Sequence, residues 1–395
     1  FVSVPGETHE LRELFRARVV NITPLEEVAT PSLPGSRSIS HLQQGAGSHD
    51  CYRRAELTVA FPFDNIGCNL PTLLATVTGN LFELREFSGL RLLDLTFPNE
   101  FRSFAGPQFG IEGTQHLAGV FKRPMIGTII KPSVGLPPEA TAEIVRTLGN
   151  AGIDFIKDDE LMADPPHSPL SVRVPRVMRE INRIADATGK KVMYAFNISD
   201  EPEAMLRHHD LVVQYGGTCV MVSIHHVGLS GVMALRNHAS VPIHGHRNGW
   251  GLYARSPSIG IDYTAWQKIW RLAGVDHLHV NGLQNKFSES DDSVVKSINA
   301  CLTPLFNDSD RAMPVISSGQ WGGQAPETYQ RTQTTDLMYL AGGGIMAHPA
   351  GPAAGCLALR QAWEAATAGI PLETYAAKHT ELRQTIEKFG GGAKR

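Results

Sequence analysis

From about residue 124 the sequence repeats one pattern eight times, a short apolar and β-branched run followed by a longer helix-like stretch. The strand-like runs are 124–132, 154–160, 191–199, 219–227, 241–247, 276–282, 313–319 and 336–344. Continuous apolar strands that alternate with helices are typical of a parallel sheet covered on both faces. Eight such units in about 240 residues predict a closed (β/α)8 TIM barrel. An open doubly wound sheet is the alternative, but its glycine-rich GxGxxG turn is missing here.

The first part of the chain lacks this rhythm. Residues 1–115 predict a smaller α+β domain of ferredoxin-like type, ahead of a barrel domain over 116–395 that ends in a helical tail. Its expected strands are at 14–23, 52–62 and 90–98, and its expected helix is at 70–80. A segment rich in Gly, Ser and Pro, 31–50, predicts a mobile loop, and 388–395 predicts a frayed tail.

Composition excludes several classes of protein. The net charge of −3 does not suggest a nucleic-acid or membrane-surface partner. No apolar run approaches the roughly 18–20 residues that span a bilayer. The five cysteines are odd in number, scattered and without CxxC spacing, which favours reduced thiols in a cytoplasmic protein over disulfides or a zinc site.

Titratable, polar or backbone-exposing residues gather where the predicted strands end, at the edge where barrel enzymes carry their active sites. They are Lys131, Lys157, Asp159, Glu160, Asn197, His244, His246, Arg247, His277, His279, Ser318, Gly319, Gly342, Gly343 and Gly344. Strands that only fill a core would end in apolar residues. We therefore expect these residues to converge on one mouth.

The stretch "KDDE" (157–160) is the most informative of these ends. Asp159 and Glu160 offer hard oxygen ligands, which suit Mg²⁺ better than zinc. Lys157 has two interpretations: a lysine that pairs with the acids, or a lysine carbamylated by CO₂ that becomes a third oxygen ligand. Taken alone the stretch favours a salt-bridged strand end, but the other strand ends shift the balance towards a metal site.

Several separated motifs then carry a resemblance. "GTIIKPSVGL", "GIDFIKDDE", "IHGHRNGWG", "DHLHVNG", "VISSG" and "LAGGGIMAHPAGPAAG" occur in the order found in the RuBisCO large-chain superfamily. The resemblance covers essentially residues 60–370. The spacings, 26 residues from Lys131 to Lys157 (157 − 131) and 33 from His246 to His279 (279 − 246), match the family.

The resemblance implies a Mg²⁺ site formed by carbamylated Lys157 with Asp159 and Glu160, so that Mg²⁺ and CO₂ are the expected cofactors. Lys131 is similar to the base that takes a proton during enolisation. His246 and His279 are similar to the family's active-site histidines.

The same resemblance assigns the substrate contacts. Lys286 matches a mobile-loop lysine that contacts a carboxylate. The residues assigned to substrate binding are Arg247, Ser318, Gly319, Gly342, Gly343 and Asn197. Asn197 is expected to hydrogen-bond a ligand of the metal, and the two glycines to offer backbone amides to a phosphate. Because the family builds its sites between two chains, a homodimer or higher homo-oligomer is expected.

Departures from the carboxylase pattern argue against a true ribulose-bisphosphate carboxylase. Ser133 replaces a second lysine, Thr72 replaces a substrate-binding asparagine, and Gln320 replaces a phosphate-site glycine. The aromatic and acidic N-terminal motif is not found. These changes resemble the RuBisCO-like proteins (form IV), which keep the metal and enolisation chemistry on other substrates.

Three branches of that group are open, with different sugar-acid or sugar-phosphate substrates. They are a tautomerase of a diketo methylthiopentyl phosphate (an enolase of methionine salvage), a methylthioribulose-phosphate isomerase, and enzymes that decarboxylate 3-oxo-isoapionate or its 4-phosphate, or transfer and hydrolyse its carboxylate. Lys286 and "HGHRNGWG" favour the third branch, a carbon–carbon lyase of carbohydrate catabolism. A non-catalytic scaffold is a further alternative, opposed by the intact "KDDE".

Some residues also have purely structural interpretations. His225, His226, His277 and His348 can each be packed or hydrogen-bonded parts of the scaffold. Lys286 can be a solvated loop lysine. Asp158 should point away from Asp159, because side chains alternate along a strand.

Overall fold

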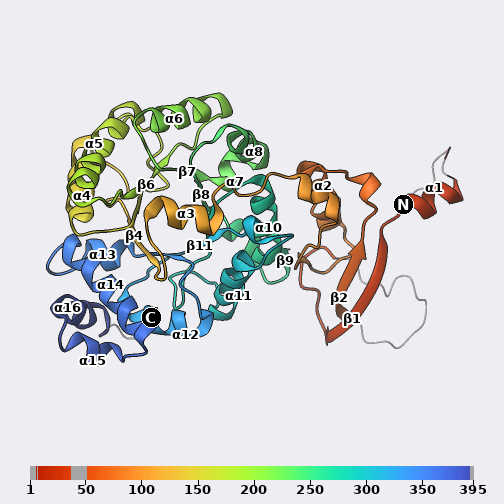
Figure 1. Ribbon diagram of the computed structural model, residues 1–395. Coiled ribbons are helices and arrows are strands. Elements are labelled where there is room, and N and C mark those ends of the chain that lie inside the picture. The colour runs from red at the N-terminus through yellow and green to blue at the C-terminus, as the bar shows by residue number, and fades with distance from the viewer. Residues whose placement is uncertain (1–5, 7, 37–50, 392–395) are drawn as a thin grey trace. The chain divides into compact units, whose positions relative to one another are not determined.

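The computed structural model describes residues 6, 8–36 and 51–391 (Figure 1). The chain divides into two compact units, one of residues 1–104 with Leu252–Ala265, the other of Ala105–Gly251 with Trp266–Arg395. The predicted boundary between residues 115 and 116 stays a prediction. Most of the predicted loop 31–50 and half of the predicted frayed tail lie outside the described residues.

The larger unit is a closed parallel barrel, as the sequence predicts. Its strands follow the order β10-β11-β12-β4-β5-β6-β7-β8 around the barrel, and every neighbouring pair is parallel. They are β4 (Met125–Ile129), β5 (Phe155–Lys157), β6 (Met193–Asn197), β7 (Cys219–Ser223), β8 (Ile243–His246), β10 (His277–His279), β11 (Met313–Ile316) and β12 (Met338–Leu340). All eight predicted strands are therefore confirmed, each within its predicted run.

Helices surround these strands (Figure 1). They are α4 (Pro138–Asn150), α5 (Leu170–Thr188), α6 (Pro202–Gln214), α7 (Ile224–Val227), α8 (Leu229–His238), α10 (Tyr263–Ala273), α11 (Asp291–Leu302), α12 (Ala325–Thr332), α13 (Gly342–Met346), α14 (Pro352–Ala368), α15 (Leu372–Ala376) and α16 (Thr380–Phe389). The short α9 (Gly251–Ala254) belongs mostly to the smaller unit. Several helices begin with proline in the first turn, where the missing N–H costs nothing. Gly189 and Gly369 end α5 and α14 in the left-handed conformation.

The short helix α3 (Gly110–Ala118) closes the N-terminal end of the barrel. Its Ile111 and Ala118 share one buried cluster with apolar residues from the beginnings of the strands. Those strand residues include Met125, Phe155, Met193, Cys219, Met313 and Met338. Most of the polar residues predicted at the strand ends lie at the opposite, C-terminal end.

A buried carboxylate fixes the start of two of these strands. Asp154 is fully buried and accepts hydrogen bonds from both Nη atoms of Arg123, at 2.6 and 2.8 Å, and from the Ile126 N–H at 2.9 Å. Lys190 forms a further ion pair with it. Burial acts to raise the pKa of Asp154, but Arg123 and Lys190 outweigh burial and lower it.

The smaller unit contains α1 (His9–Phe15), α2 (Leu70–Val77) and two separate strand pairs. β1 (Arg18–Val28) pairs antiparallel with β2 (Tyr52–Ala60), and β3 (Leu90–Leu92) pairs in parallel with β9 (Ile259–Ile261). The strand predicted from residue 14 begins only at 18, because residues 14–15 end α1. β9 was not predicted. No helix in the described part of the chain is long and apolar enough to cross a membrane.

The remaining ordered turns are short 3-10 helices. They are η2 (Phe63–Asn65), η3 (Asn80–Glu83), η4 (Asn99–Ser103), η5 (Asp308–Asp310) and η6 (Gly322–Gln324). The last of these lies on the loop after β11, close to the strand ends that carry the candidate site.

Candidate active site

Lys157 is the last residue of β5 and lies almost entirely out of water. Its side chain is 1% exposed, and Nζ donates to the Asp158 carbonyl at 2.9 Å and lies 3.7 Å from Glu160 Oε2. Burial lowers the pKa of this amine, against the opposing pull of the three neighbouring acids. An amine of lowered pKa is more easily neutral, and only the neutral amine reacts with CO₂.

Lys131 and Asp159 face each other across the ends of β4 and β5. Lys131 Nζ donates to Asp159 Oδ2 and to Ser133 Oγ, each at 2.6 Å. The Asp159 side chain is 2% exposed, while that of Lys131 is 41% exposed. A lysine thus holds one oxygen of a carboxylate to which the sequence assigns metal binding.

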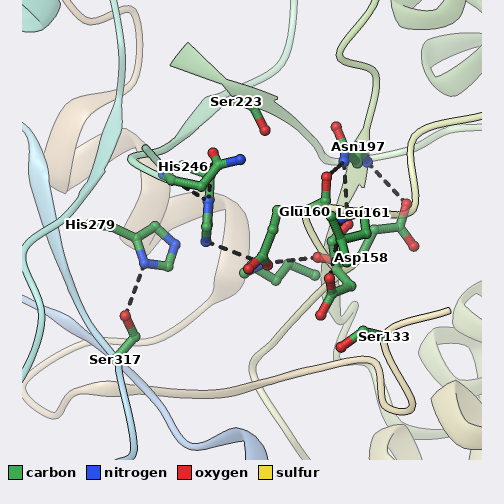
Figure 2. A network of polar contacts seen from close by, with 12 residues as sticks. Ser133, Asp158, Glu160, Leu161, Asn197, Ser223, His246, His279 and Ser317 are labelled. Carbon is green, nitrogen blue, oxygen red and sulfur yellow. Dashed lines mark hydrogen bonds and ion pairs between the residues drawn. The ribbon is translucent and has the colours of Figure 1, made fainter. Parts of the chain in front are cut away.

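Glu160 points towards His246, as Figure 2 shows. Glu160 Oε2 lies 3.7 Å from His246 Nε2. Burial acts to raise the pKa of Glu160, but His246 and then Lys157 lower it overall. Burial and the charge of Lys157 lower the pKa of His246 to about 4. With its pKa at about 4, His246 is neutral near pH 7.

Asn197 and Asp158 fix the backbone of residues 158–160 through hydrogen bonds. Asn197 Nδ2 donates to the carbonyl oxygens of Asp159 and Glu160, at 3.2 and 3.1 Å. Asp158 is fully buried and accepts hydrogen bonds from the Tyr194 hydroxyl at 2.5 Å, the Asn197 N–H and the Arg173 guanidinium. Asn197, predicted to bind substrate, therefore contacts the backbone of the predicted metal ligands.

Three buried histidines form a hydrogen-bonded row from the mouth into the barrel. Ser317 Oγ lies 3.0 Å from His279 Nδ1, and His279 Nε2 lies 2.8 Å from His244 Nε2. His244 Nδ1 lies 3.4 Å from His277 Nδ1, and His277 Nε2 lies 2.8 Å from Thr114 Oγ1 on α3. Burial lowers the pKa of all three rings, that of His277 to about 3, so they are neutral near pH 7.

The far end of the row sets the direction of every bond. Thr114 Oγ1 donates to the Gly110 carbonyl, so it can only accept from His277 Nε2–H. His277 Nδ1 is then an acceptor, and His244 must carry its proton on Nδ1 and accept at Nε2. His279 consequently carries its proton on Nε2 and presents Nδ1 as an acceptor to Ser317. His277 is a hydrogen-bonded core residue, one of its two interpretations.

A second polar network joins the ends of β8, β10 and β11. Arg247 Nη2 donates to Glu289 Oε2 at 2.6 Å, and Asn281 Nδ2 donates to the same oxygen at 2.7 Å. Ser318 Oγ donates to Asn281 Oδ1 at 2.6 Å. Arg247 and Ser318, predicted to bind substrate, are thus linked through Glu289 and Asn281, which were not among the predicted site residues. An acid ten residues after a histidine strand gives no signal in sequence.

The predicted loop lysine lies at the edge of this network. The Lys286 N–H donates to the Ser318 carbonyl at 3.3 Å, and Gly319 lies against the Lys286 side chain. Lys286 itself is exposed, with Nζ 5.3 Å from the centre of the Phe287 ring. The structure therefore brings the backbone of this loop to the strand ends, while the ammonium group lies over an aromatic ring.

The three glycines after β12 differ in the space around them. A Cβ on Gly343 would meet nothing within 4 Å, whereas a Cβ on Gly344 would lie 2.6 Å from the Gln320 carbonyl oxygen. Gln320 is buried, and its amide donates to the Leu283 carbonyl at 3.0 Å and accepts from the Tyr339 hydroxyl at 2.9 Å. Gln320 therefore anchors the loop after β10, and the open space lies beside Gly343.

His225 supports the loop that carries His246. His225 Nδ1 donates to the Asn248 carbonyl at 2.9 Å, and its Nε2 accepts from Trp266 Nε1–H at 2.7 Å. Asn248 Oδ1 in turn lies 3.0 Å from His246 Nδ1. His225 thus has the packed role that the sequence allowed. His348, hydrogen-bonded to the Glu381 carbonyl and the Ala350 N–H, is likewise structural.

One other cluster has the residue types of a metal site. His209, Asp210 and His238 offer ligand atoms within 4.8 Å of one another, and they are the one such His, Cys, Asp or Glu group among the described residues. The Ser240 N–H donates to His209 Nε2 at 3.2 Å, so His209 carries its proton on Nδ1, towards Asp210. A ring that donates from Nδ1 has no lone pair there for a cation.

Comparison with known proteins places these strand ends in a family. Residues 110–389 match the catalytic domain, and 44–101 the N-terminal domain, of the ribulose bisphosphate carboxylase large chain. The chain is 49% identical over 395 residues to 3-oxo-isoapionate-4-phosphate decarboxylase of Rhizobium rhizogenes, covering 99% of this chain and 92% of that protein.

Two further relatives are similarly close. The chain is 53% identical over 388 residues to 3-oxo-isoapionate-4-phosphate transcarboxylase/hydrolase of Xanthobacter autotrophicus, covering 98% of this chain and 91% of that protein. A crystal structure of a rubisco-like protein from Burkholderia fungorum superposes with a TM-score of 0.90 at 48% identity, over 96% of this chain and 93% of that one.

Proposed function

Since the chain belongs to the ribulose bisphosphate carboxylase large-chain family, we propose that it cleaves the carboxylate from 3-oxo-isoapionate 4-phosphate. The observation that carries this proposal is the convergence of Lys131, Lys157, Asp159, Glu160 and His246 on one mouth of the barrel. The names of the two relatives support the same substrate. The diketo phosphate tautomerase, the isomerase and the scaffold have no comparable support.

The residues present fit a magnesium ion held by Asp159, Glu160 and a carbamate on Lys157. With an ammonium on Lys157, the two lysines and two acids around the site sum to zero charge. A carbamate changes Lys157 from +1 to −1, which leaves a net charge of −2 that a divalent cation neutralises. Oxygen donors of this kind suit Mg²⁺. When bound, Mg²⁺ would stabilise negative charge on a substrate carbonyl oxygen.

Loss of a carboxylate from the carbon adjacent to a ketone breaks one carbon–carbon bond. The bonding electrons move onto the carbonyl oxygen to give an enolate, and CO₂ leaves. The enolate carbon must then receive one proton. Lys131 lies at the mouth with its Nζ beside Asp159, and we assign it to the exchange of that proton. We assign His246, which is neutral near pH 7 and faces Glu160, to the orientation of a substrate hydroxyl.

We assign the phosphate to the open space beside Gly343. A residue without a side chain lets backbone N–H groups approach an anion. Gly342, which precedes it, is the second amide of the assigned site, and Lys286 is the cation assigned to the departing carboxylate. Lys286 can serve this role only by leaving its position over the Phe287 ring.

A homodimer is the proposed assembly. In the smaller unit, β1 leaves Val19, Val20 and Ile22 between 54% and 61% exposed. Apolar residues exposed side by side on a strand are typical of a surface covered in an assembly.

A cytoplasmic location, proposed from the cysteines, is consistent with five free thiols, three of them buried.

The test is an assay with Mg²⁺ and bicarbonate on 3-oxo-isoapionate and its 4-phosphate, each labelled with ¹³C in the carboxylate. Loss of the phosphorylated keto acid supports the proposal. Labelled CO₂ released mole for mole indicates decarboxylation. Retention of the label in a shorter acid indicates carboxyl transfer and hydrolysis. Neither substrate being consumed would overturn the proposed reaction.

A further inference from the structure

Glu289 lies at the centre of the polar network that faces the strand ends of β8, β10 and β11. Its Oε2 accepts from Arg247 at 2.6 Å and from Asn281 at 2.7 Å, and its Oε1 accepts from Ser293 Oγ at 2.9 Å. The side chains of Arg247 and Glu289 are 7% and 14% exposed. The proposed mechanism gives this acid no task, although a carboxylate so far out of water needs a reason.

We infer that Glu289 is a specificity-determining residue that limits the substrate to a single phosphate group. The inference rests on the proposed function and deepens it: the part of the substrate that lies beside Arg247 and Ser318 carries no phosphate. Its first physical basis is charge. Arg247, Asn281, Glu289 and Ser318 form one wall of the site. Glu289 cancels the positive charge of Arg247, which is the cation of this wall that a second phosphate would need.

A second phosphate would bring a charge of about −1.5 to −2 next to the partly buried Glu289 carboxylate. Glu289 Oε2 holds Arg247 Nη2, so a phosphate that takes this donor must turn Arg247 away from Glu289. The turn would leave the Glu289 carboxylate buried without its cation, which is strongly unfavourable. The wall therefore repels a doubly phosphorylated sugar rather than merely failing to bind it.

The second basis is the direction of the hydrogen bonds. An ionised carboxylate only accepts, so Asn281 must turn its Nδ2 towards Glu289 and its Oδ1 towards Ser318. Ser318 consequently donates its hydroxyl proton to Asn281 Oδ1, and its oxygen lone pairs can accept hydrogen bonds from other groups. A substrate hydroxyl can donate to these lone pairs, whereas a phosphate at pH 7 needs donors.

The backbone holds this arrangement in place. Asn281 and Ser318 both adopt positive φ, +65° and +76°, a conformation that non-glycine residues rarely adopt. Such strain persists only where the surrounding contacts enforce it. The Glu289 carboxylate supplies one of those contacts through Asn281, so the acid sets both the charge and the donor pattern of the wall.

The test compares the binding of two probes, ribulose 5-phosphate and ribulose 1,5-bisphosphate, by isothermal titration calorimetry on the full chain with Mg²⁺ and bicarbonate. The wild-type chain should prefer the monophosphate. Glu289→Gln should shift the ratio of the two dissociation constants towards the bisphosphate by at least about tenfold. Asp292→Asn is the matched control, because it removes the same charge from a nearby side chain that is 94% exposed. It should leave the ratio unchanged.

Four outcomes would overturn the inference. The wild-type chain could prefer the bisphosphate or bind neither probe, the ratio could stay unchanged in a folded Glu289→Gln variant, or Asp292→Asn could change the ratio equally. Turnover of 3-oxo-isoapionate 4-phosphate is measured separately. A shifted ratio without turnover removes the proposed reaction but keeps the role of Glu289, and turnover without a shift does the reverse.

Discussion

Replacing Thr114 by valine should reverse the row of buried histidines. In the wild-type chain Thr114 Oγ1 accepts from His277 Nε2–H, and this single acceptor fixes the proton positions up to His279. Valine has nearly the same shape but no acceptor. The row can avoid a buried N–H without a partner only if each ring moves its proton to the other nitrogen. His279 should then carry its proton on Nδ1 and donate to Ser317.

The expected energetic effect follows from the burial of the row. A buried donor left without a partner costs about 1–3 kcal/mol, and reversal of the row exchanges that donor for an unsatisfied acceptor. We therefore expect the free energy of unfolding to fall by about 1–2 kcal/mol, towards the lower part of that range. Thr114→Ser keeps the hydroxyl and serves as the control. It should leave the proton positions unchanged and lower the free energy of unfolding only by the small cost of the missing methyl group.

The assay is two-bond ¹H–¹⁵N correlation of histidine-labelled protein, with signals assigned through single-histidine substitutions. Wild type and Thr114→Ser should show His279 protonated on Nε2, and Thr114→Val should show it protonated on Nδ1. A loss of stability alone cannot produce this change. A wild-type His279 protonated on Nδ1, or a folded Thr114→Val chain with His279 still protonated on Nε2, would refute the reasoning.

Other substitutions test the remaining parts of the site and the scaffold. Gly343→Ala should keep the melting temperature and raise the KM for the phosphorylated substrate about tenfold or more, because its Cβ enters open space assigned to the phosphate; Gly344→Ala should instead lower the melting temperature, because its Cβ would lie 2.6 Å from a backbone oxygen. Lys157→Met should abolish the bicarbonate-dependent binding of Mg²⁺ in calorimetry, and retained binding would refute the carbamate. Asp154→Asn should cost about 3–5 kcal/mol at neutral pH, since it leaves two cations beside a buried site. The pKa of Asp154 is lowered in the folded state, so its stabilisation is present above the ordinary pKa near about 4 and is lost as pH falls through the folded value. The difference in melting temperature between wild type and Asp154→Asn should therefore begin to narrow below about pH 4 and close only once the pH is below the folded pKa.

Much of the barrel could be predicted because one physical pattern governs it. A parallel strand buried on both faces has to be continuously apolar, so all eight strands could be located from their side chains alone. β9 could not, because three residues paired with β3 in the smaller unit carry no periodic signal. The short β3, which covers residues 90–92 of a predicted 90–98, shows the same limit.

The candidate site divides in a similar way. Residues at strand ends could be named from sequence because strand order brings those ends together, as with Lys131 and Asp159. Residues that act through another side chain could not. Thr114 lies on α3, more than 160 residues before the ring that it holds, and Glu289 lies on a loop with no pattern. Side-chain hydrogen bonds over such separations depend on the folded geometry.

The four charged residues of "KDDE" serve different purposes, which explains why they stand side by side. Asp158 is fully buried and satisfies Tyr194 and Arg173, so it belongs to the scaffold. Asp159, on the opposite side of the chain, is held by a lysine from the neighbouring strand, and Glu160 faces His246. Lys157 is 1% exposed and lies beside Glu160, and its amine is the group on which the proposed carbamate forms. The strand therefore ends in charged residues for two reasons. Asp158 fixes the strand end through its hydrogen bonds, while Asp159, Glu160 and Lys157 form part of the candidate active site.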